Sequence, residues 1–205
     1  SLADAPGNKE KRPSLGSITH NDPPRTSRAR AIASKGCFGT LDISTLHIIT
    51  SIALNKGMRI STADVVGAYL NAQLNDNVYM RINKTLTPFL IQSNPIYKDY
   101  VKHDGSVLVK LKKALYGLKQ SGRLWYEKIS SILTSLKFVK SKFDQCLFTL
   151  KTEHVYVIIG VYVDDLFIIS NNENNEKYII KQLSKNLQGI TINTGTNLSY
   201  LGMQY

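Results

Sequence analysis

One stretch of the chain, Val155 to Ser170, constrains the fold more than any other. It reads Val-Tyr-Val-Ile-Ile-Gly-Val-Tyr-Val-Asp-Asp-Leu-Phe-Ile-Ile-Ser, two arms rich in β-branched and aromatic residues around Asp164 and Asp165. This pattern predicts a β-hairpin with both carboxylates at its tip. Because the arms are almost wholly apolar, the two carboxylates should lie at the mouth of a buried sheet.

The segments around this hairpin predict an α+β fold. Residues 58–66 are typical of a strand that carries Asp64 near its end, and residues 67–74 of a turn away from that strand. Apolar residues at helical spacing predict helices over 121–137 and 175–187. Two helices laid across one face of an antiparallel sheet would form a layered α+β domain.

The remaining segments are shorter and less regular. Residues 44–56 have the apolar spacing of a helix that Ser44 or Thr45 could cap. Residues 83–106 hold two prolines and little periodicity, so we expect an irregular excursion there. Four more short strands are expected, at residues 78–82, at residues 107–111, and on either side of Asn193-Thr194-Gly195.

Composition limits the class of protein. With 42% hydrophobic and 20% charged residues among 205, the chain is globular rather than disordered, although residues 1–27 read as a flexible leader. The longest apolar run has nine residues, too few for a membrane helix, so no membrane association is expected. Two isolated cysteines favour a reducing intracellular compartment.

The charge is strongly positive and clustered. The chain carries 26 Lys and Arg against 15 Asp and Glu, a net charge of +11. Between Val107 and Lys142 there are nine basic residues and one acid, Glu127. Such a basic stripe is typical of a surface that binds a polyanion such as nucleic acid. The alternative is a solvated surface that only keeps the protein soluble.

Three acids could hold a metal ion. Adjacent aspartates such as Asp164 and Asp165 often form no more than a polar turn, but at the mouth of a buried sheet their mutual repulsion and desolvation favour a bound divalent cation. Asp64 could supply a third carboxylate, or could simply cap the following turn. Three acids on neighbouring strands beside a basic stripe suggest two-metal phosphoryl chemistry.

Several motifs then resemble one family. Tyr162-Val163-Asp164-Asp165 resembles the YxDD box of reverse transcriptases, and Asp64-Val65-Val66-Gly67-Ala68-Tyr69 resembles their first palm motif, an aspartate followed five positions later by an aromatic residue. Leu115 to Gly122, continued by Trp125-Tyr126, is similar to the LYGLKQ-W signature of Ty/copia LTR retrotransposons. Residues 198–205 resemble that family's LGI-type strand, and Arg28-Ala29-Arg30 with Lys35-Gly36 loosely resembles its fingers segment.

This resemblance covers residues 28–205 and implies the fingers and palm of a right-hand polymerase, with an antiparallel palm sheet backed by helices and no thumb. The implied activity is RNA-directed DNA synthesis from dNTPs on an RNA or DNA primer–template, with two Mg²⁺ ions, or Mn²⁺ in their place. The implied parent is a Pol polyprotein with integrase, for DNA integration, and RNase H. Such a polyprotein would be found in cytoplasmic virus-like particles or in the nucleus.

The resemblance also assigns roles to individual residues. The metal ligands would be Asp64 and Asp164, with Asp165 as a close partner and the Val65 carbonyl as an extra ligand. Tyr69 would be a steric gate against the ribose 2′-hydroxyl, or else an amphipathic aromatic residue between lobes. The remaining nucleotide-binding residues would be Gly67, Ala68, Tyr116, Gly117, Lys119 and Arg30.

Some alternatives stay open at this stage. Lys119 could equally be a solvated cation. Trp125 lies on an apolar helical face and is expected in the core rather than stacked on a base. The chain could be an inactive retroelement remnant that only binds nucleic acid, or a different metal-dependent phosphotransferase or nuclease.

Overall fold

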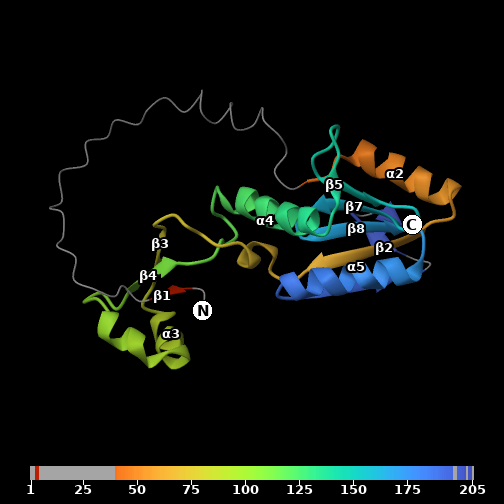
Figure 1. The fold of residues 1–205 in the computed structure, drawn as a ribbon. Coiled ribbons are helices and arrows are strands. Elements are labelled where there is room, and N and C mark those ends of the chain that lie inside the picture. Colours follow the sequence, from red (N-terminus) through yellow and green to blue (C-terminus); the bar gives the residue numbers. More distant parts are fainter. Residues whose placement is uncertain (1–2, 5–39, 196–197, 202, 205) are drawn as a thin grey trace, which may run out of the picture. The chain divides into compact units, whose positions relative to one another are not determined.

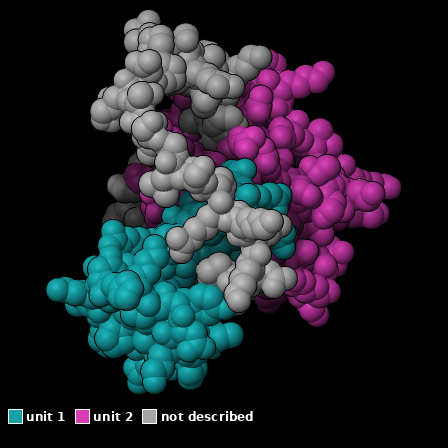
Figure 2. Space-filling view, turned by 90° about the vertical axis from the view of Figure 1, so that its left-hand side faces the viewer, with its two compact units in different colours: residues 1–34, 73–113 teal, residues 35–72, 114–205 magenta. Residues whose placement is uncertain are grey.

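The structure, a computed structural model, describes residues 3–4, 40–195, 198–201 and 203–204 (Figure 1). It divides into two compact units, coloured separately in Figure 2. Unit 1 comprises residues 1–34 and 73–113, and unit 2 comprises residues 35–72 and 114–205. Apart from Ala3–Asp4, the predicted leader at residues 1–27 lies outside the described residues, as do Arg30 and the rest of the expected fingers segment at residues 28–36.

Unit 2 is built on a six-stranded sheet whose neighbouring strands are all antiparallel, in the order β5-β6-β7-β8-β2-β9. The predicted hairpin is confirmed as β7 and β8, in the middle of this sheet, and the predicted Asp64 strand is β2 beside it. The strands are β2 (Arg59–Val65), β5 (Val139–Lys140), β6 (Leu147–Lys151), β7 (Tyr156–Tyr162), β8 (Asp165–Ser170) and β9 (Ile190–Thr194).

Two helices cover one face of this sheet, as the sequence predicted (Figure 1). They are α4 (Ser121–Ser135) and α5 (Glu173–Asn186). Their apolar residues recur at helical spacing, which places them on one face of each helix, and those residues are buried. The largest fully buried side chains on these helices are Trp125, Ile129, Leu133, Ile179 and Leu183.

The opposite face of the sheet is covered by two smaller elements. One is the segment that leads into α2 (Ile43–Asn55), in which Leu41 packs directly on Gly160 of β7. The contact is so close that a Cβ added to Gly160 would lie 2.6 Å from Leu41 Cδ2. A small hairpin formed by β10 (Ser199–Tyr200) and β11 (Met203–Gln204) also contacts this face, where the rings of Tyr200 and Phe167 are 5.0 Å apart.

Unit 1 contains a three-stranded sheet with two helices, and here the sequence prediction was wrong. The strands are β1 (Ala3–Asp4), β4 (Val107–Leu111) and β3 (Tyr79–Ile82), in that spatial order. Residues 83–106 are not irregular: they form α3 (Thr87–Ser93) and the 3₁₀ helix η2 (Pro95–Tyr100). Each proline lies in the first turn, where the missing N–H costs no hydrogen bond, so it starts a helix rather than breaking one.

Three further expectations need correction. Asp42 caps α2, in place of Ser44 or Thr45, because its carboxylate accepts the Ser44 N–H. β5 and β6 were not predicted from the sequence. Asn193 and Thr194 lie inside β9 and not between two strands.

No described helix is long and apolar enough to cross a membrane. The described α2, α4 and α5 span 13, 15 and 14 residues, and a bilayer crossing needs about 20.

Candidate active site

The acidic turn is a two-residue connection between the central strands. β7 ends at Tyr162 and β8 begins at Asp165, and these two residues are paired across the hairpin. Only Asp164 therefore lies in the turn itself, together with Val163, whereas the sequence predicted both carboxylates at the tip. Val163 has φ of 53° and Asp164 has no positive φ, which is the pattern of a type II′ turn. Because Val163 is β-branched, this left-handed conformation is strained.

Two hydrogen bonds hold the turn against its neighbours. The Trp125 indole Nε1–H donates to the Val163 carbonyl at 2.6 Å, and the Val65 N–H donates to the Asp164 carbonyl at 2.8 Å. Trp125 is completely buried, so the prediction that it belongs to the core is confirmed. Its bond to the acidic turn was not predicted, because spacing shows only which face of the helix Trp125 occupies.

Asp64 and Asp165 lie directly opposite each other on β2 and β8. Residues paired in this way point to the same face, with Cβ atoms about 4.5–5.5 Å apart. Burial raises the pKa of the Asp165 carboxyl, and the neighbouring Asp164 and Asp64 carboxylates raise it further. The three acids are therefore close enough for each of the other two to act on Asp165.

The acids do not form a closed metal cage. Among the described residues, no group of three or more Asp, Glu, His or Cys side chains is arranged to hold a metal ion. The donor set nevertheless suits Mg²⁺, which prefers oxygen ligands and is usually bound by one or two carboxylates together with substrate phosphates. In an antiparallel strand the N–H and the carbonyl of one residue point to the same side. The Val65 N–H donates to the Asp164 carbonyl, so the Val65 carbonyl also faces the acidic turn.

Tyr69 and Tyr116 meet although they are 47 positions apart in the sequence. Their ring centroids are 4.5 Å apart, with an angle of 57° between the ring planes. The pKa of the Tyr69 hydroxyl is raised by burial, then by Tyr116 and Asp164. The structure thus brings together Tyr69, the predicted gate, Tyr116, a predicted nucleotide-binding residue, and the acidic turn, all within unit 2.

The remaining nucleotide-binding candidates lie in the loops that carry these two tyrosines. Gly67 has φ of 57° and precedes the 3₁₀ helix η1 (Ala68–Asn71), in which Ala68 is buried. Gly117 has φ of 93°, and apart from its two chain neighbours no described residue comes within 4 Å of the position that a Cβ would take. Lys119 is exposed. Arg30 lies outside the described residues.

Asn71 is a site residue that the sequence analysis missed. Its amide N–H₂ donates to the Gly67 carbonyl at 3.1 Å, and its side-chain oxygen accepts the Gln188 N–H at 2.8 Å. It therefore ties the Gly67 loop to the segment that leads into β9. Its signal in the sequence is weak: an Asx residue within the turn expected over residues 67–74, where such side chains often bind nearby backbone groups.

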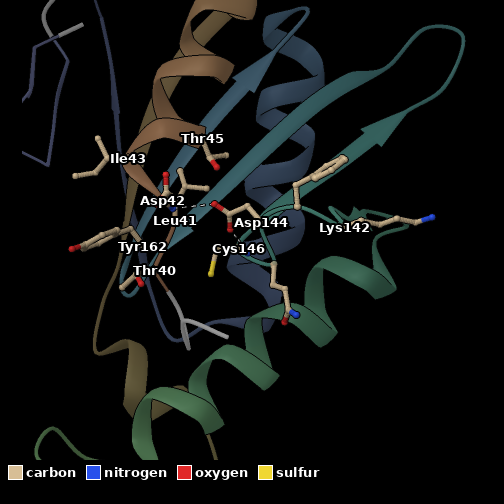
Figure 3. A pocket seen from close by; sticks show the side chains of 11 residues that line it. Thr40, Leu41, Asp42, Ile43, Thr45, Lys142, Asp144, Cys146 and Tyr162 are labelled. Atoms are coloured by element: carbon tan, nitrogen blue, oxygen red, sulfur yellow. Dashed lines mark hydrogen bonds between the residues drawn. The ribbon is translucent and has the colours of Figure 1, made fainter. Parts of the chain in front are cut away.

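A cavity of about 690 Å³ lies beside the acidic turn and shares Tyr162 with the YxDD-like box (Figure 3). Within it the Asp42 N–H donates to Asp144 at 3.0 Å, and the second oxygen of Asp144 accepts the Cys146 N–H. Its acids are therefore occupied by backbone N–H groups. None of the residues predicted for metal or nucleotide binding lines this cavity.

Comparison with known proteins defines the class. Residues 37–205 match the model of the family described as reverse transcriptase (RNA-dependent DNA polymerase). The chain belongs to this family, as its motifs predicted. The predicted mixed α+β fold with an antiparallel sheet is confirmed as well, and the sheet of unit 2 has six strands.

The similar proteins are retrotransposon polyproteins. The chain is 34% identical over 129 residues to the Retrovirus-related Pol polyprotein from transposon RE1 of Arabidopsis thaliana, which covers 63% of this chain and 8% of that protein. It is 33% identical over 146 residues to the Transposon Ty1-MR1 Gag-Pol polyprotein of Saccharomyces cerevisiae, 71% of this chain and 7% of that protein. The chain thus spans less than a tenth of either relative, and the predicted resemblance to Ty/copia Pol proteins is confirmed.

Proposed function

We propose that this chain is the fingers–palm part of a Ty/copia-type reverse transcriptase, which extends a primer 3′-hydroxyl with dNTPs on an RNA or DNA template. The observation that carries the proposal is the placement of Asp64 directly opposite Asp165, next to the turn that bears Asp164. The Tyr69–Tyr116 contact supports it, because both tyrosines come from motifs expected at the nucleotide.

In this proposal the acids would hold the metal ions between which the reacting groups are aligned. Asp64 and Asp164, helped by Asp165 and the Val65 carbonyl, would bind two Mg²⁺ ions, which lower the pKa of the primer hydroxyl and neutralise the triphosphate and departing pyrophosphate. Tyr69 would lie against the sugar and exclude a 2′-hydroxyl. Gly117 leaves room for a base pair, because no side chain projects from it. Gly67 and Ala68 would place their backbone near the triphosphate, with Lys119 and Arg30 as supporting cations.

Primer extension tests the proposal directly. On an oligo(dT)–poly(A) substrate with dTTP and Mg²⁺, the chain extended through its natural downstream sequence should add nucleotides. The Asp164→Asn variant should abolish incorporation while folding and RNA binding stay largely intact. Absence of incorporation by the wild-type chain would favour a remnant that only binds nucleic acid, and hydrolysis without dNTPs would favour a nuclease.

The partners follow from the same proposal. They would be an RNA or DNA primer–template, dNTPs and the integrase and RNase H parts of a Pol polyprotein. The place of action would then be a cytoplasmic virus-like particle or the nucleus.

A further inference from the structure

The backbone of the acidic turn is held by a residue from a distant element. Val163 directly precedes Asp164 and has φ of 53°, a conformation that a β-branched residue adopts only when its surroundings enforce it. Its carbonyl accepts the indole N–H of Trp125 at 2.6 Å, across 38 positions of sequence. A buried indole N–H normally has a hydrogen-bond partner, and here the partner is this strained peptide group.

Trp125 is itself part of the packed core of unit 2. Its side chain is 0% exposed and lies in the first turns of α4, in the same core as Ile129 and Leu133. Ser121, one turn earlier, donates its hydroxyl to the Leu115 carbonyl, so this end of α4 also fixes the loop that carries Tyr116. Because this end of α4 is fixed, the Trp125 indole can hold the Val163 carbonyl in a defined position.

We propose that Trp125 is a positioning residue, which sets the orientation of the Asp164 carboxylate by holding the Val163 peptide group. The proposal rests on the proposed function, because it supposes that Asp164 binds a metal ion there. Trp125 touches neither substrate nor metal. It acts by fixing the backbone from which the Asp164 side chain projects, as hydrogen-bonded partners of metal ligands generally do.

The sequence offers a matched control. Tyr126, the next residue, is also buried, and its hydroxyl donates to the Gln145 carbonyl at 2.8 Å. Trp125→Phe and Tyr126→Phe therefore each remove one side-chain-to-backbone hydrogen bond of α4 and keep an aromatic ring. Tyr126→Phe should lower the Tm by about 2–4 °C, and Trp125→Phe should lower it further, because the smaller ring also leaves a void in the core. Only the first of these bonds reaches the acidic turn.

The test is Mn²⁺ binding to the 205-residue chain, measured by electron paramagnetic resonance of the free ion. Trp125→Phe should weaken Mn²⁺ binding about 10-fold, and Tyr126→Phe should leave it unchanged. Equal binding by both variants, whether intact or weakened, would overturn the role of Trp125 and leave the proposed function standing. If the wild-type chain binds no Mn²⁺, or Asp164→Asn binds it equally well, the carboxylate site fails and the role of Trp125 fails with it.

A second readout needs no metal. Trp125 is the only tryptophan in the sequence, so the chain has a single indole N–H resonance. That resonance should exchange slowly with D₂O and should shift in the Asp164→Asn variant. Exchange as fast as that of an exposed indole would overturn the proposal.

Discussion

At the scale of single residues, the site is defined by charges that repel one another. Asp165 is half-buried, pairs with Asp64 across β2 and β8, and follows Asp164 in the chain. Nothing within this trio neutralises the charge, and the raised pKa of Asp165 reflects both burial and the two neighbouring acids. A site of this kind stores unfavourable energy in the folded state until a cation binds.

This repulsion predicts a particular dependence on pH. A raised folded-state pKa means that Asp165 contributes stability below about pH 3.9, its ordinary value, and that this contribution is lost as the pH rises through the folded-state pKa. In EDTA, the Asp165→Asn variant should therefore melt at a higher temperature than wild type at pH 7. The difference should disappear as the pH falls towards 3.5.

Thermal melting between pH 3.5 and 7.5 measures this effect. The matched control is Glu153→Gln, which removes an exposed carboxylate from the turn between β6 and β7. A stabilisation of equal size in the control would show that general charge, rather than the local repulsion, is responsible.

Tyr69 carries the second residue-scale prediction. Its ring is held by Tyr116, 4.5 Å away between centroids, and its hydroxyl lies close enough to Asp164 for that carboxylate to raise its pKa. If it bars the 2′-hydroxyl, Tyr69→Val should reduce the preference for dNTPs over ribonucleotides by about 10- to 100-fold, the range of one pocket contact. The ratio of kcat/KM for dTTP and UTP measures this preference. As a control, Tyr178→Val replaces an exposed tyrosine of α5 and should leave this ratio unchanged. An unchanged ratio for Tyr69→Val would remove the gate assignment.

At the scale of elements, one ion pair joins α5 to the sheet. Arg59 at the start of β2 contacts Glu176 with 3.3 Å between Nε and Oε2, and the Glu176 side chain is only 4% exposed against 46% for Arg59. Removing the arginine would leave a buried carboxylate without its partner. Neutralising the glutamate would leave an amide that can still accept from Arg59.

The two substitutions should therefore differ. Arg59→Met should lower the free energy of unfolding by about 2 kcal/mol, and Glu176→Gln by about 1 kcal/mol. Urea titration at pH 7 measures both. The exposed pair Glu173–Lys177 on the same helix is the control, and Lys177→Met should cost less than about 0.5 kcal/mol. An equally small cost for Arg59→Met would show that the pair does not anchor α5.

The same scale shows what the sequence could and could not predict. The β7–β8 hairpin and the helices α4 and α5 were predicted because each has an unbroken pattern, apolar arms in the first case and a 3.6-residue period in the others. α3 and η2 were missed because their prolines read as breakers, although both lie in first turns. β5 has two residues, both exposed, so it has no burial pattern to detect.

The candidate site also has residues that the sequence predicts and contacts that it could not predict. Short motifs predict the acids and Tyr69 as site residues, and the placement of Asp64 opposite Asp165 agrees with that prediction. The indole bond of Trp125 and the bridge formed by Asn71 could not be predicted, because each joins segments whose separation in the sequence carries no signal of contact. Pairings of this kind depend on the complete fold.

At the scale of the whole molecule, the positive charge is divided unevenly. Unit 1, with 75 residues, carries 13 Lys and Arg against 6 acids, a net charge of +7, and unit 2, with 130 residues, carries 13 against 9, a net charge of +4. The basic stripe at residues 107–142 also crosses the boundary between the units at residues 113 and 114. Unit 1 therefore has the higher density of groups that attract phosphates, and unit 2 has the three acids.

This division predicts that folding and nucleic-acid affinity can be separated. The chain leaves and re-enters unit 2 at Ala72 and Ala114, where the Ala114 N–H donates to the Ala72 carbonyl at 3.0 Å. A link of two to five Gly and Ser residues can close this gap, as in a hairpin loop. The shortened chain, residues 35–72 joined to 114–205, should keep its Tm within a few degrees because its six-stranded sheet, α4 and α5 are intact.

Binding of an RNA–DNA duplex should change in a defined way. The slope of log Kobs against log salt concentration should fall by about 0.9 for each phosphate contact that unit 1 supplies. Mn²⁺ binding should be unaffected, because all three acids belong to unit 2. Fluorescence anisotropy of a labelled duplex, recorded between about 50 and 200 mM salt, measures the change in this slope. An unchanged slope in a folded shortened chain would place the phosphate contacts on unit 2, despite its lower charge density.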